Sequence, residues 1–299
     1  GDFPLTAPVR LADNVWLRGS GRGTRLRVAG ANQAGVGLLG QGTKGATVSD
    51  LAVTAKDNQA AQAGIVLDAC GDCQVRDVFA VGFADYGIWV RNSSFLCQVR
   101  GCTLAGNGKA NLYLDQLARG EYGDFIPNLV SDCVIYGGGK GIQLHRAIVV
   151  NVVGCVVYQT QDVAYYVGGV SNSVVISGCR SFQISSHAVV VDNAHEFNLS
   201  SNIFCWHTGH GVVVKDCNWG TICGNEVIDT GSYNPGGVDH QTKWQELPND
   251  VPMMDGIVLA HAQGYNVTGN TIFNWPVVPK MRYGIYEDDR SFSNVISGN

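Results

Sequence analysis

Short apolar phrases return along this chain at a nearly constant interval. Gly-Ile-Gln-Leu begins at position 141, Ala-Val-Val-Val at 188 and Gly-Val-Val-Val at 211, and each is followed by a second phrase such as Val-x-Gly-Cys or Leu-Ser-Ser-Asn. Most successive repeats start 23 or 24 residues apart, and the starts are Gly64, Gly87, Asn111, Gly141, Ala164, Ala188, Gly211, Gly256 and Gly284. A regular interval of this length is typical of a repeat protein, in which each unit packs on its neighbours.

Each repeat has the pattern of a short strand with one buried face. Apolar residues stand one and three positions past the start, as Ile65 and Leu67 or Ile142 and Leu144 do. This period of two indicates a strand, and no 3.6-residue apolar period runs long enough for a helix. Since a unit of about 23 residues cannot bury its face alone, stacked units must share a core. The sequence therefore predicts an all-β solenoid, a parallel β-helix with one coil per repeat.

The second phrase forms its own column of small polar residues and thiols. Cysteines fill it in four coils and asparagines in the next four, at Cys102, Cys133, Cys155, Cys179, Asn202, Asn225, Asn270 and Asn299. Buried thiols behave as small apolar side chains, so we expect these cysteines to be free. Cys73 and Cys97 both begin Cys-Gln-Val-Arg and should lie above one another, either bonded or simply stacked.

The chain resembles the right-handed β-helices of the pectate-lyase-like superfamily. The asparagine column carries this resemblance, together with the opening Gly-Asp-Phe-Pro-Leu-Thr-Ala-Pro-Val-Arg-Leu and the run Asn-Val-Trp-Leu-Arg-Gly-Ser-Gly-Arg-Gly-Thr from position 14. It implies a single right-handed, single-stranded β-helix domain over residues 1–299, with both ends trimmed. It also implies a secreted or periplasmic protein. It leaves the reaction open, because lyases, hydrolases, epimerases and phage spikes share this fold.

Composition limits the classes of partner that the protein is expected to bind. The net charge is −5, which disfavours a nucleic-acid surface, and no run of eighteen apolar residues is present to span a membrane. The sequence leaves open whether the protein is a monomer or a homotrimer. The expected partner is a polysaccharide or oligosaccharide.

Two longer connections interrupt the regular coils. One covers residues 115–128, and the other is a polar insertion over 229–254 that is punctuated by Pro and Gly. Long loops of a solenoid usually gather on its working face. We therefore predict that 229–254 forms a lid or cleft wall, which would add Asp239, Lys243, Trp244 and Glu246 to the substrate-binding residues.

Outward strand positions carry rings beside charges over several coils. Such a row suits an extended sugar chain, because rings stack on sugar faces and charged groups bond to hydroxyls or carboxylates. The predicted substrate-binding residues of the strands are Trp89, Arg91, Tyr113, Asp115, His145 and Tyr166.

The predicted catalytic residues occupy equivalent positions in successive coils. His187, His210 and Asp255 stand just before three consecutive strands, with the long insertion directly before Asp255. Asp192 and Lys215 lie further along the same coils. The fragments Gly-His-Gly at 209 and Asp-Gly-Ile at 255 resemble motifs of polygalacturonase-like hydrolases, although in reverse order and without the adjacent Asp-Asp pair.

Two reactions compete on these residues. Hydrolysis needs an acid and a second carboxylate, for which Asp255 could act with Asp192, Asp239 or Glu246. Elimination or epimerisation of a uronate needs a base and a cation, which Lys215, His210, His187 or Arg91 could supply. Carboxylates outnumber bases around the insertion, which favours hydrolysis. No cofactor is expected, with calcium at residues 287–289 as an alternative.

A non-catalytic β-helix would show the same rings. A spike, an adhesin or a sugar-binding module therefore remains an alternative to an enzyme that cleaves glycosidic bonds.

Overall fold

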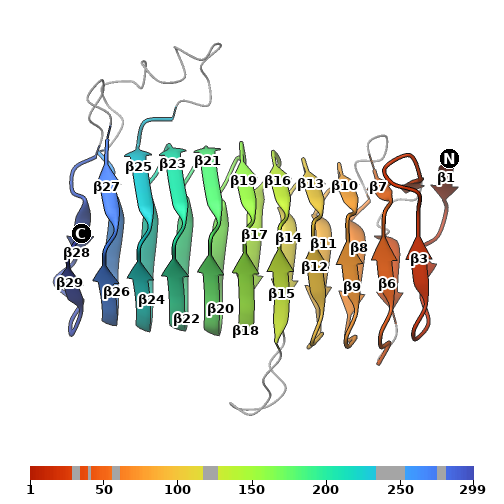
Figure 1. The fold of residues 1–299 in the computed structure, drawn as a ribbon, viewed down its shortest axis with the longest axis horizontal. Coiled ribbons are helices and arrows are strands. Elements are labelled where there is room, and N and C mark those ends of the chain that lie inside the picture. Colours follow the sequence, from red (N-terminus) through yellow and green to blue (C-terminus); the bar gives the residue numbers. More distant parts are fainter. Residues whose placement is uncertain (29–33, 40–41, 56–60, 117–126, 234–252, 275–280) are drawn as a thin grey trace.

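Parallel β-strands build the whole described part of the protein. The computed structural model describes residues 1–28, 34–39, 42–55, 61–116, 127–233, 253–274 and 281–299. In these residues every paired strand is parallel to its neighbour, and regular coils pair residues 23 or 24 apart, as Tyr86 does with Ala63 and Ala110. The coils stack along the long axis of the molecule (Figure 1). The predicted all-β parallel β-helix is confirmed.

One strand of each coil belongs to an 11-stranded sheet, which we call the third face. Its strands follow the order of the coils. They are β1 (Asp2–Leu5), β4 (Arg25–Val28), β7 (Ala52–Thr54), β10 (Phe79–Val81), β13 (Thr103–Ala105), β16 (Val134–Tyr136), β19 (Val156–Tyr158), β21 (Arg180–Ile184), β23 (Ile203–His207), β25 (Glu226–Thr230) and β27 (Thr271–Phe273).

The other strands form an 18-stranded sheet with two faces. The first face holds the repeat starts found in the sequence: β2 (Val9–Arg10), β5 (Ala34–Leu39), β8 (Ala63–Asp68), β11 (Tyr86–Arg91), β14 (Ala110–Asp115), β17 (Lys140–His145) and β28 (Ile285–Glu287). The second face holds β3 (Trp16–Arg18), β6 (Thr47–Ser49), β9 (Gln74–Arg76), β12 (Gln98–Arg100), β15 (Asn128–Ser131), β18 (Ile148–Val153) and β29 (Val295–Ser297).

Four long strands run through both of these faces. They are β20 (Tyr165–Ser177), β22 (Val189–Ser200), β24 (Val212–Cys223) and β26 (Ile257–Thr268). Left-handed residues mark the corner inside each strand, such as Val170 at φ 66° in β20 and Asp216 at φ 54° in β24. A single left-handed residue redirects an extended chain, so the strand turns from the first face to the second without a loop.

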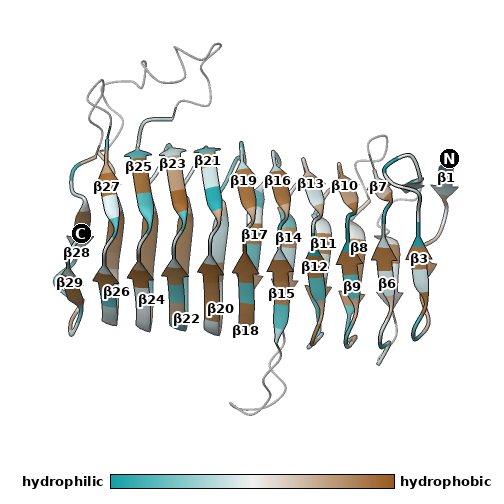
Figure 2. Cartoon of the chain, in the orientation of Figure 1, coloured by the Kyte–Doolittle hydropathy of each residue, from teal (hydrophilic) through white to brown (hydrophobic). Residues whose placement is uncertain are grey.

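The core lies inside the coil, where the predicted apolar columns meet. Ile65, Ile88, Leu112, Val189 and Val212 are fully buried or nearly so. Figure 2 shows that hydrophobic segments recur on strand after strand along the stack. This arrangement is what shared burial between repeats requires.

The asparagine and cysteine column forms a hydrogen-bonded ladder inside one corner. The side-chain oxygen of Asn225 accepts the backbone N–H of Asn202 at 3.1 Å, and that of Asn270 accepts the N–H of Asn225 at 3.1 Å. Cys179 takes the same role, since its Sγ accepts the N–H of Cys155 at 3.4 Å.

All ten cysteines are free, as expected for the four in this column. Cys73 and Cys97 are not bonded to each other, and the Sγ atoms of Cys70 and Cys97 lie 3.9 Å apart.

Candidate functional site

Three aromatic rings cluster on the first face, across β11 and β14. The ring centroids of Tyr86 and Tyr113 lie 4.8 Å apart, and Trp89 stacks on Tyr113 at 6.2 Å with an interplanar angle of 19°. The rings are half-buried and pack on one another. Burial raises the pKa of the Tyr113 phenol, and the charge of Asp115 adds to this. The Trp89 indole N–H has no hydrogen-bond partner within the described chain.

Ion pairs flank this cluster. Arg91 lies 4.2 Å above the Trp89 ring and donates two hydrogen bonds to Asp68, at 2.9 and 2.7 Å. Asp115 ends the next strand, and Arg146, directly after β17, donates to both of its carboxylate oxygens, at 2.6 and 2.7 Å. These pairs fix the charged side chains beside the rings, because two hydrogen bonds from one guanidinium to a carboxylate are directional as well as strong.

Further along the first face, two glycines leave a gap in the outward side chains. In successive strands the aligned positions are Asp115, His145, Gly168 and Asp192. A Cβ on Gly168 would lie 2.6 Å from the Tyr166 hydroxyl oxygen, and one on Gly169 would collide with Nε2 of His145. Each polar atom therefore lies over one of the two neighbouring glycines, in space that a side chain would otherwise fill. We call this place the Gly168–Gly169 site.

Asp115 orients the His145 ring in this site. Its carboxylate oxygen lies 3.3 Å from Nδ1 of His145. An ionised carboxylate only accepts hydrogen bonds, so in the neutral imidazole Nδ1 carries the proton and Nε2 keeps a free lone pair. The His145 side chain is 34% exposed. This arrangement makes Nε2 of His145 a proton acceptor at the surface.

Tyr166, Asp192 and Lys215 complete the surroundings. Burial raises the pKa of Tyr166, and the charge of Asp192 raises it further, so the phenol keeps its proton at neutral pH. Lys215 pairs in register with Asp192 on the neighbouring strand, and its side chain is 55% exposed. The Asp192 side chain has no hydrogen bond or ion pair with another described residue. A base and an acid thus lie on adjacent coils, and an exposed cation lies two coils further along.

His187, His210 and Asp255 lie in adjacent coils at the opposite end of the strands. The His187 and His210 rings stack, with centroids 5.3 Å apart. Nδ1 of His187 accepts the N–H of His210, and Nδ1 of His210 accepts the N–H of Asp255, both at 2.8 Å. Burial lowers the pKa of both histidines, and His187 is lowered further by the charge of His210.

The Asp255 carboxylate is buried and fully engaged. Arg282 donates to both of its oxygens, at 3.1 and 2.8 Å, and the N–H of Tyr283 donates at 3.2 Å. Its side chain is 1% exposed.

The residues predicted to be catalytic therefore fall into two groups. His187 and Asp192 are five residues apart on one extended segment, which corresponds to roughly 16 Å. Asp255 lies at the His187 end of the strands and Lys215 at the Asp192 end. Asp255 and Asp192 are thus too far apart for the spacing of about 6.5–9.5 Å that inverting hydrolysis uses.

Several predictions concern residues beyond those described. Asp239, Lys243, Trp244 and Glu246 all lie in 234–252, outside the described residues, as do 117–126 of the other long connection. At the edges, β14 continues to Asp115 and β25 to Thr230, so each strand extends into the range predicted as a connection.

The described residues contain no group of three or more His, Cys, Asp or Glu side chains arranged for a metal ion. At the candidate calcium position, Asp288 instead accepts the N–H of His261 at 2.9 Å and the hydroxyl of Ser291 at 2.7 Å. No helix that could cross a membrane occurs in the described chain.

The sequence placed His145 and Tyr166 among the binding residues, but it did not reveal that both rings lie over the Gly168–Gly169 pair. It also missed Arg146 and Arg282, whose side chains reach across coils to Asp115 and Asp255. The signal that could have revealed the site is the Gly-Gly pair at 168, which breaks a column that is polar in the coils on both sides.

Comparisons with known proteins agree with this architecture. The family model described as "Right handed beta helix region" matches residues 86–299. No curated protein sequence matches the chain.

Solved structures are similar in fold at low identity. The A-module of the Azotobacter vinelandii mannuronan C-5 epimerase AlgE6 has a TM-score of 0.69 at 13% identity, covering all of this chain and 89% of that one. The Dettilon tailspike protein has a TM-score of 0.78 at 14% identity, covering 99% of this chain and 58% of its own. The tailspike of E. coli bacteriophage HK620 in complex with a pentasaccharide has a TM-score of 0.61 at 12% identity, covering all of this chain and 60% of its own.

Proposed function

Because the chain belongs to the right-handed β-helix family, we propose that it binds a uronate-containing polysaccharide along the first face and acts on it at the Gly168–Gly169 site. The binding part is supported by the aromatic cluster and its flanking ion pairs. Solved structures of this fold include a mannuronan C-5 epimerase and a tailspike bound to a pentasaccharide, so polysaccharides are a ligand class that the fold accommodates.

The observation that carries the chemistry is the pairing of Asp115 with Nδ1 of His145. It leaves Nε2 of His145 as a base over Gly169, and the Tyr166 hydroxyl lies over the neighbouring Gly168. A neutral imidazole beside a protonated phenol is suited to removing a proton at one atom and returning one at another. Lys215 lies three coils beyond His145, about 14 Å along the stack, so it can bind the carboxylate of another uronate in the same sugar chain.

The reaction begins with removal of the C5 proton of a uronate. Nε2 of His145 takes the proton, and the negative charge spreads into the carboxylate group of the same uronate. In an elimination, the electron pair forms the C4–C5 double bond, the C4–O bond breaks, and Tyr166 gives its proton to the leaving oxygen. In an epimerisation, Tyr166 gives its proton to the opposite side of C5 and no bond of the sugar chain breaks.

Hydrolysis, which the sequence alone favoured, lacks support from the candidate carboxylates on the described first face. Asp115 and Asp192 are three coils apart, about 14 Å, and Asp115 is held by Arg146. Hydrolysis through Asp239 or Glu246 is therefore an outcome for the experiment to detect, and so is sugar binding without turnover.

The test is a panel of neutral and uronate polysaccharides incubated in deuterated water. We expect only uronate polymers to react, with either the ultraviolet absorbance of an unsaturated uronate or deuterium at C5. His145→Gln should lower the rate about 10²–10⁴-fold while binding is retained. The matched control is His195→Gln, a histidine past the corner on the second face, where it pairs in register with Asn172.

New reducing ends with neither absorbance nor deuterium would mean hydrolysis and would contradict the proposal. Sugar binding without any product would identify a binding module instead.

A further inference from the structure

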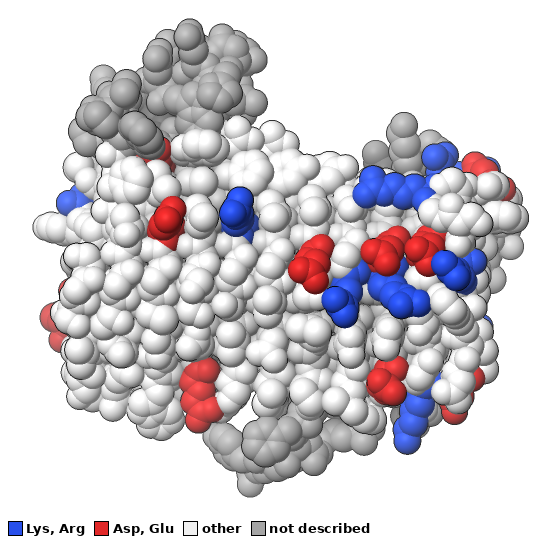
Figure 3. Space-filling model, in the orientation of Figure 1, with Lys and Arg blue, Asp and Glu red and all other residues white. Residues whose placement is uncertain are grey.

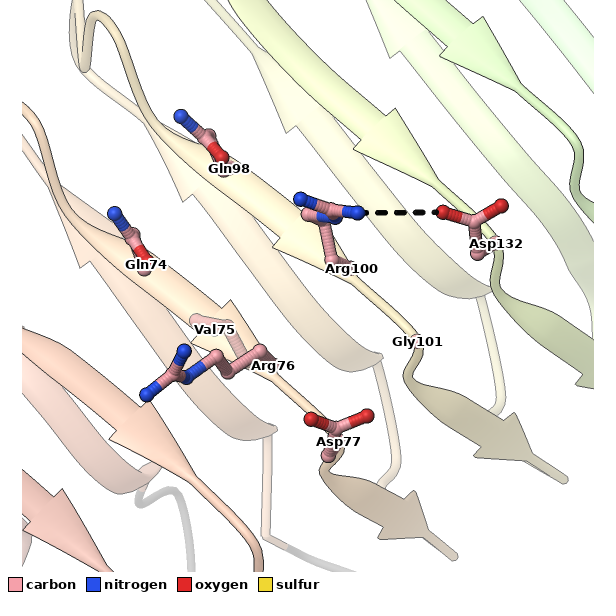
Figure 4. Close-up of a pocket in the computed structure, with 8 residues that line it drawn as sticks. All are labelled: Gln74, Val75, Arg76, Asp77, Gln98, Arg100, Gly101 and Asp132. Atoms are coloured by element: carbon pink, nitrogen blue, oxygen red, sulfur yellow. Dashed lines mark ion pairs between the residues drawn. The ribbon is translucent and has the colours of Figure 1, made fainter.

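A polar hollow lies on the second face, away from the first-face site. The repeated phrase Cys-Gln-Val-Arg at 73 and 97 builds its floor, with Val75 and Val99 pointing into the core and the glutamines and arginines pointing outward. The hollow has a volume of about 430 Å³, which is within the usual size of a small-molecule site. Figure 4 shows Gln74 and Gln98 projecting side by side from neighbouring strands.

A glycine opens this hollow. The turns after β6, β9 and β15 place Asp50, Asp77 and Asp132 in the left-handed region, whereas the turn after β12 has Gly101 there. A Cβ on Gly101 would come within 2.7 Å of the Asp77 carboxylate. Because that Cβ is absent, the coil of Gly101 leaves room between two carboxylates.

The polar groups around the hollow keep free bonding capacity. The amides of Gln74 and Gln98 make no side-chain hydrogen bond with any described residue. Arg100 and Asp132 lie 3.9 Å apart and are 59% and 62% exposed, so each retains sites for a ligand. Arg76 is held in place by the Trp16 ring, 5.0 Å below its guanidinium, and the Trp16 indole donates to Ser49 at 2.9 Å.

The charges of the hollow balance. Two arginines face two aspartates, and Figure 3 shows acidic and basic side chains side by side over the N-terminal coils of this face. A polyanion would be repelled by the carboxylates as much as it is attracted by the guanidiniums. Amide, guanidinium and carboxylate groups together donate to and accept from hydroxyls, and the stacked coils repeat them every ~4.8 Å.

We propose that this hollow is a second glycan-binding site, which holds a neutral, hydroxyl-rich stretch of a polysaccharide and takes no part in the reaction. It goes beyond the proposed function because it lies on a different face and needs no acid or base. A second contact of this kind raises the effective concentration of a long chain at the first face without changing the bonds made there.

The test measures binding rather than turnover, so it stands independently of the proposed reaction. The probes are immobilised neutral and uronate-bearing glycans. The double variant Gln74→Ala/Gln98→Ala is compared with Gln159→Ala/Gln183→Ala, which removes a pair of stacked glutamines from a different turn, where Gln159 donates to Gln183 at 3.0 Å. Both double glutamine variants are also made in a Trp89→Ala/Tyr113→Ala background, which removes two rings of the aromatic cluster on the first face.

We expect the first-face variant to retain binding to neutral glycans. The Gln74/Gln98 change should weaken that binding about tenfold or more, and the Gln159/Gln183 change should not. The proposal is overturned if the first-face variant loses all binding, or if the two glutamine pairs behave alike. Binding restricted to uronates, or no glycan binding by the unaltered protein, would overturn it as well.

Discussion

His210 accepts the backbone N–H of Asp255 at its Nδ1, 2.8 Å away, just as His187 accepts the N–H of His210. This bond requires Nδ1 to be unprotonated, so the neutral ring carries its proton on Nε2. His187 and His210 therefore present hydrogen-bond donors to the outside, whereas His145 presents an acceptor. The two stacked histidines are suited to holding a substrate oxygen and His145 to removing a proton.

Asp255→Ala should destabilise the protein by about 2–3 kcal/mol, because it removes three hydrogen bonds to a buried charged group and leaves the Tyr283 N–H without a partner. Urea unfolding measures this, and Asp216→Ala, which removes a more exposed carboxylate, is the control. Unchanged stability together with lost activity would instead place Asp255 in the chemistry.

Stability should fall as the pH is lowered below about 6.5. Burial lowers the pKa of His207 to about 3, so the folded protein resists a proton that the unfolded chain takes up near pH 6.5. Above pH 6.5 His207 is neutral in both states, so the folded protein has its full stability there. Between about pH 6.5 and 3 the unfolding free energy falls by up to ~1.4 kcal/mol per pH unit.

A double variant isolates this group. Ser181 Oγ is the hydrogen-bond partner of His207, at 3.1 Å, so His207→Leu/Ser181→Ala removes both polar partners together. We expect its unfolding free energy to depend less steeply on pH than that of the unaltered protein. The exposed His261→Gln variant should keep the original slope, and a double variant that also kept it would contradict the assignment.

Gly169→Ala should impair activity as well as stability. Its φ of 68° strains any residue with a Cβ, at a cost of about 1–2 kcal/mol, and the added Cβ would displace the His145 ring. Gly178→Ala is the matched control, since φ is 62° but the nearest atom to the added Cβ is 3.9 Å away. Both variants should lose similar stability, and only Gly169→Ala should lose turnover. Equal activity of the two would argue against His145 as the base.

Asn225→Ala should cost about 2–3 kcal/mol, because two N–H donors of Asn202 lose their acceptor in the core. Asn225→Cys should cost less, since Cys179 fills the equivalent position and its sulfur accepts an N–H. Thermal unfolding of the two variants measures the difference. A cysteine variant no more stable than the alanine variant would show that the sulfur does not replace the amide oxygen.

The repeat could be predicted from the sequence because burial with period two is a local property of each strand. Ile88 and Leu112 had to face inward, and the spacing then fixed which residues are neighbours across coils. The same spacing placed His187, His210 and Asp255 in adjacent coils correctly.

Side-chain pairing across coils was not predictable in this way. Arg146 and Arg282 each have several rotamers, and only the surrounding packing decides that they reach Asp115 and Asp255. The proton positions on His145 and His210 depend on which atom of a neighbouring coil forms a hydrogen bond with Nδ1 of each ring. The sequence therefore identified the residues of the first face but not their roles.

The buried thiols offer a further use. Cys102, Cys133, Cys155 and Cys179 mark four consecutive turns of the solenoid, and each is wholly shielded from solvent. A thiol-specific reagent can label any of them only after its own turn has opened. Mapping the order of labelling by mass spectrometry would therefore show at which end the solenoid begins to unfold.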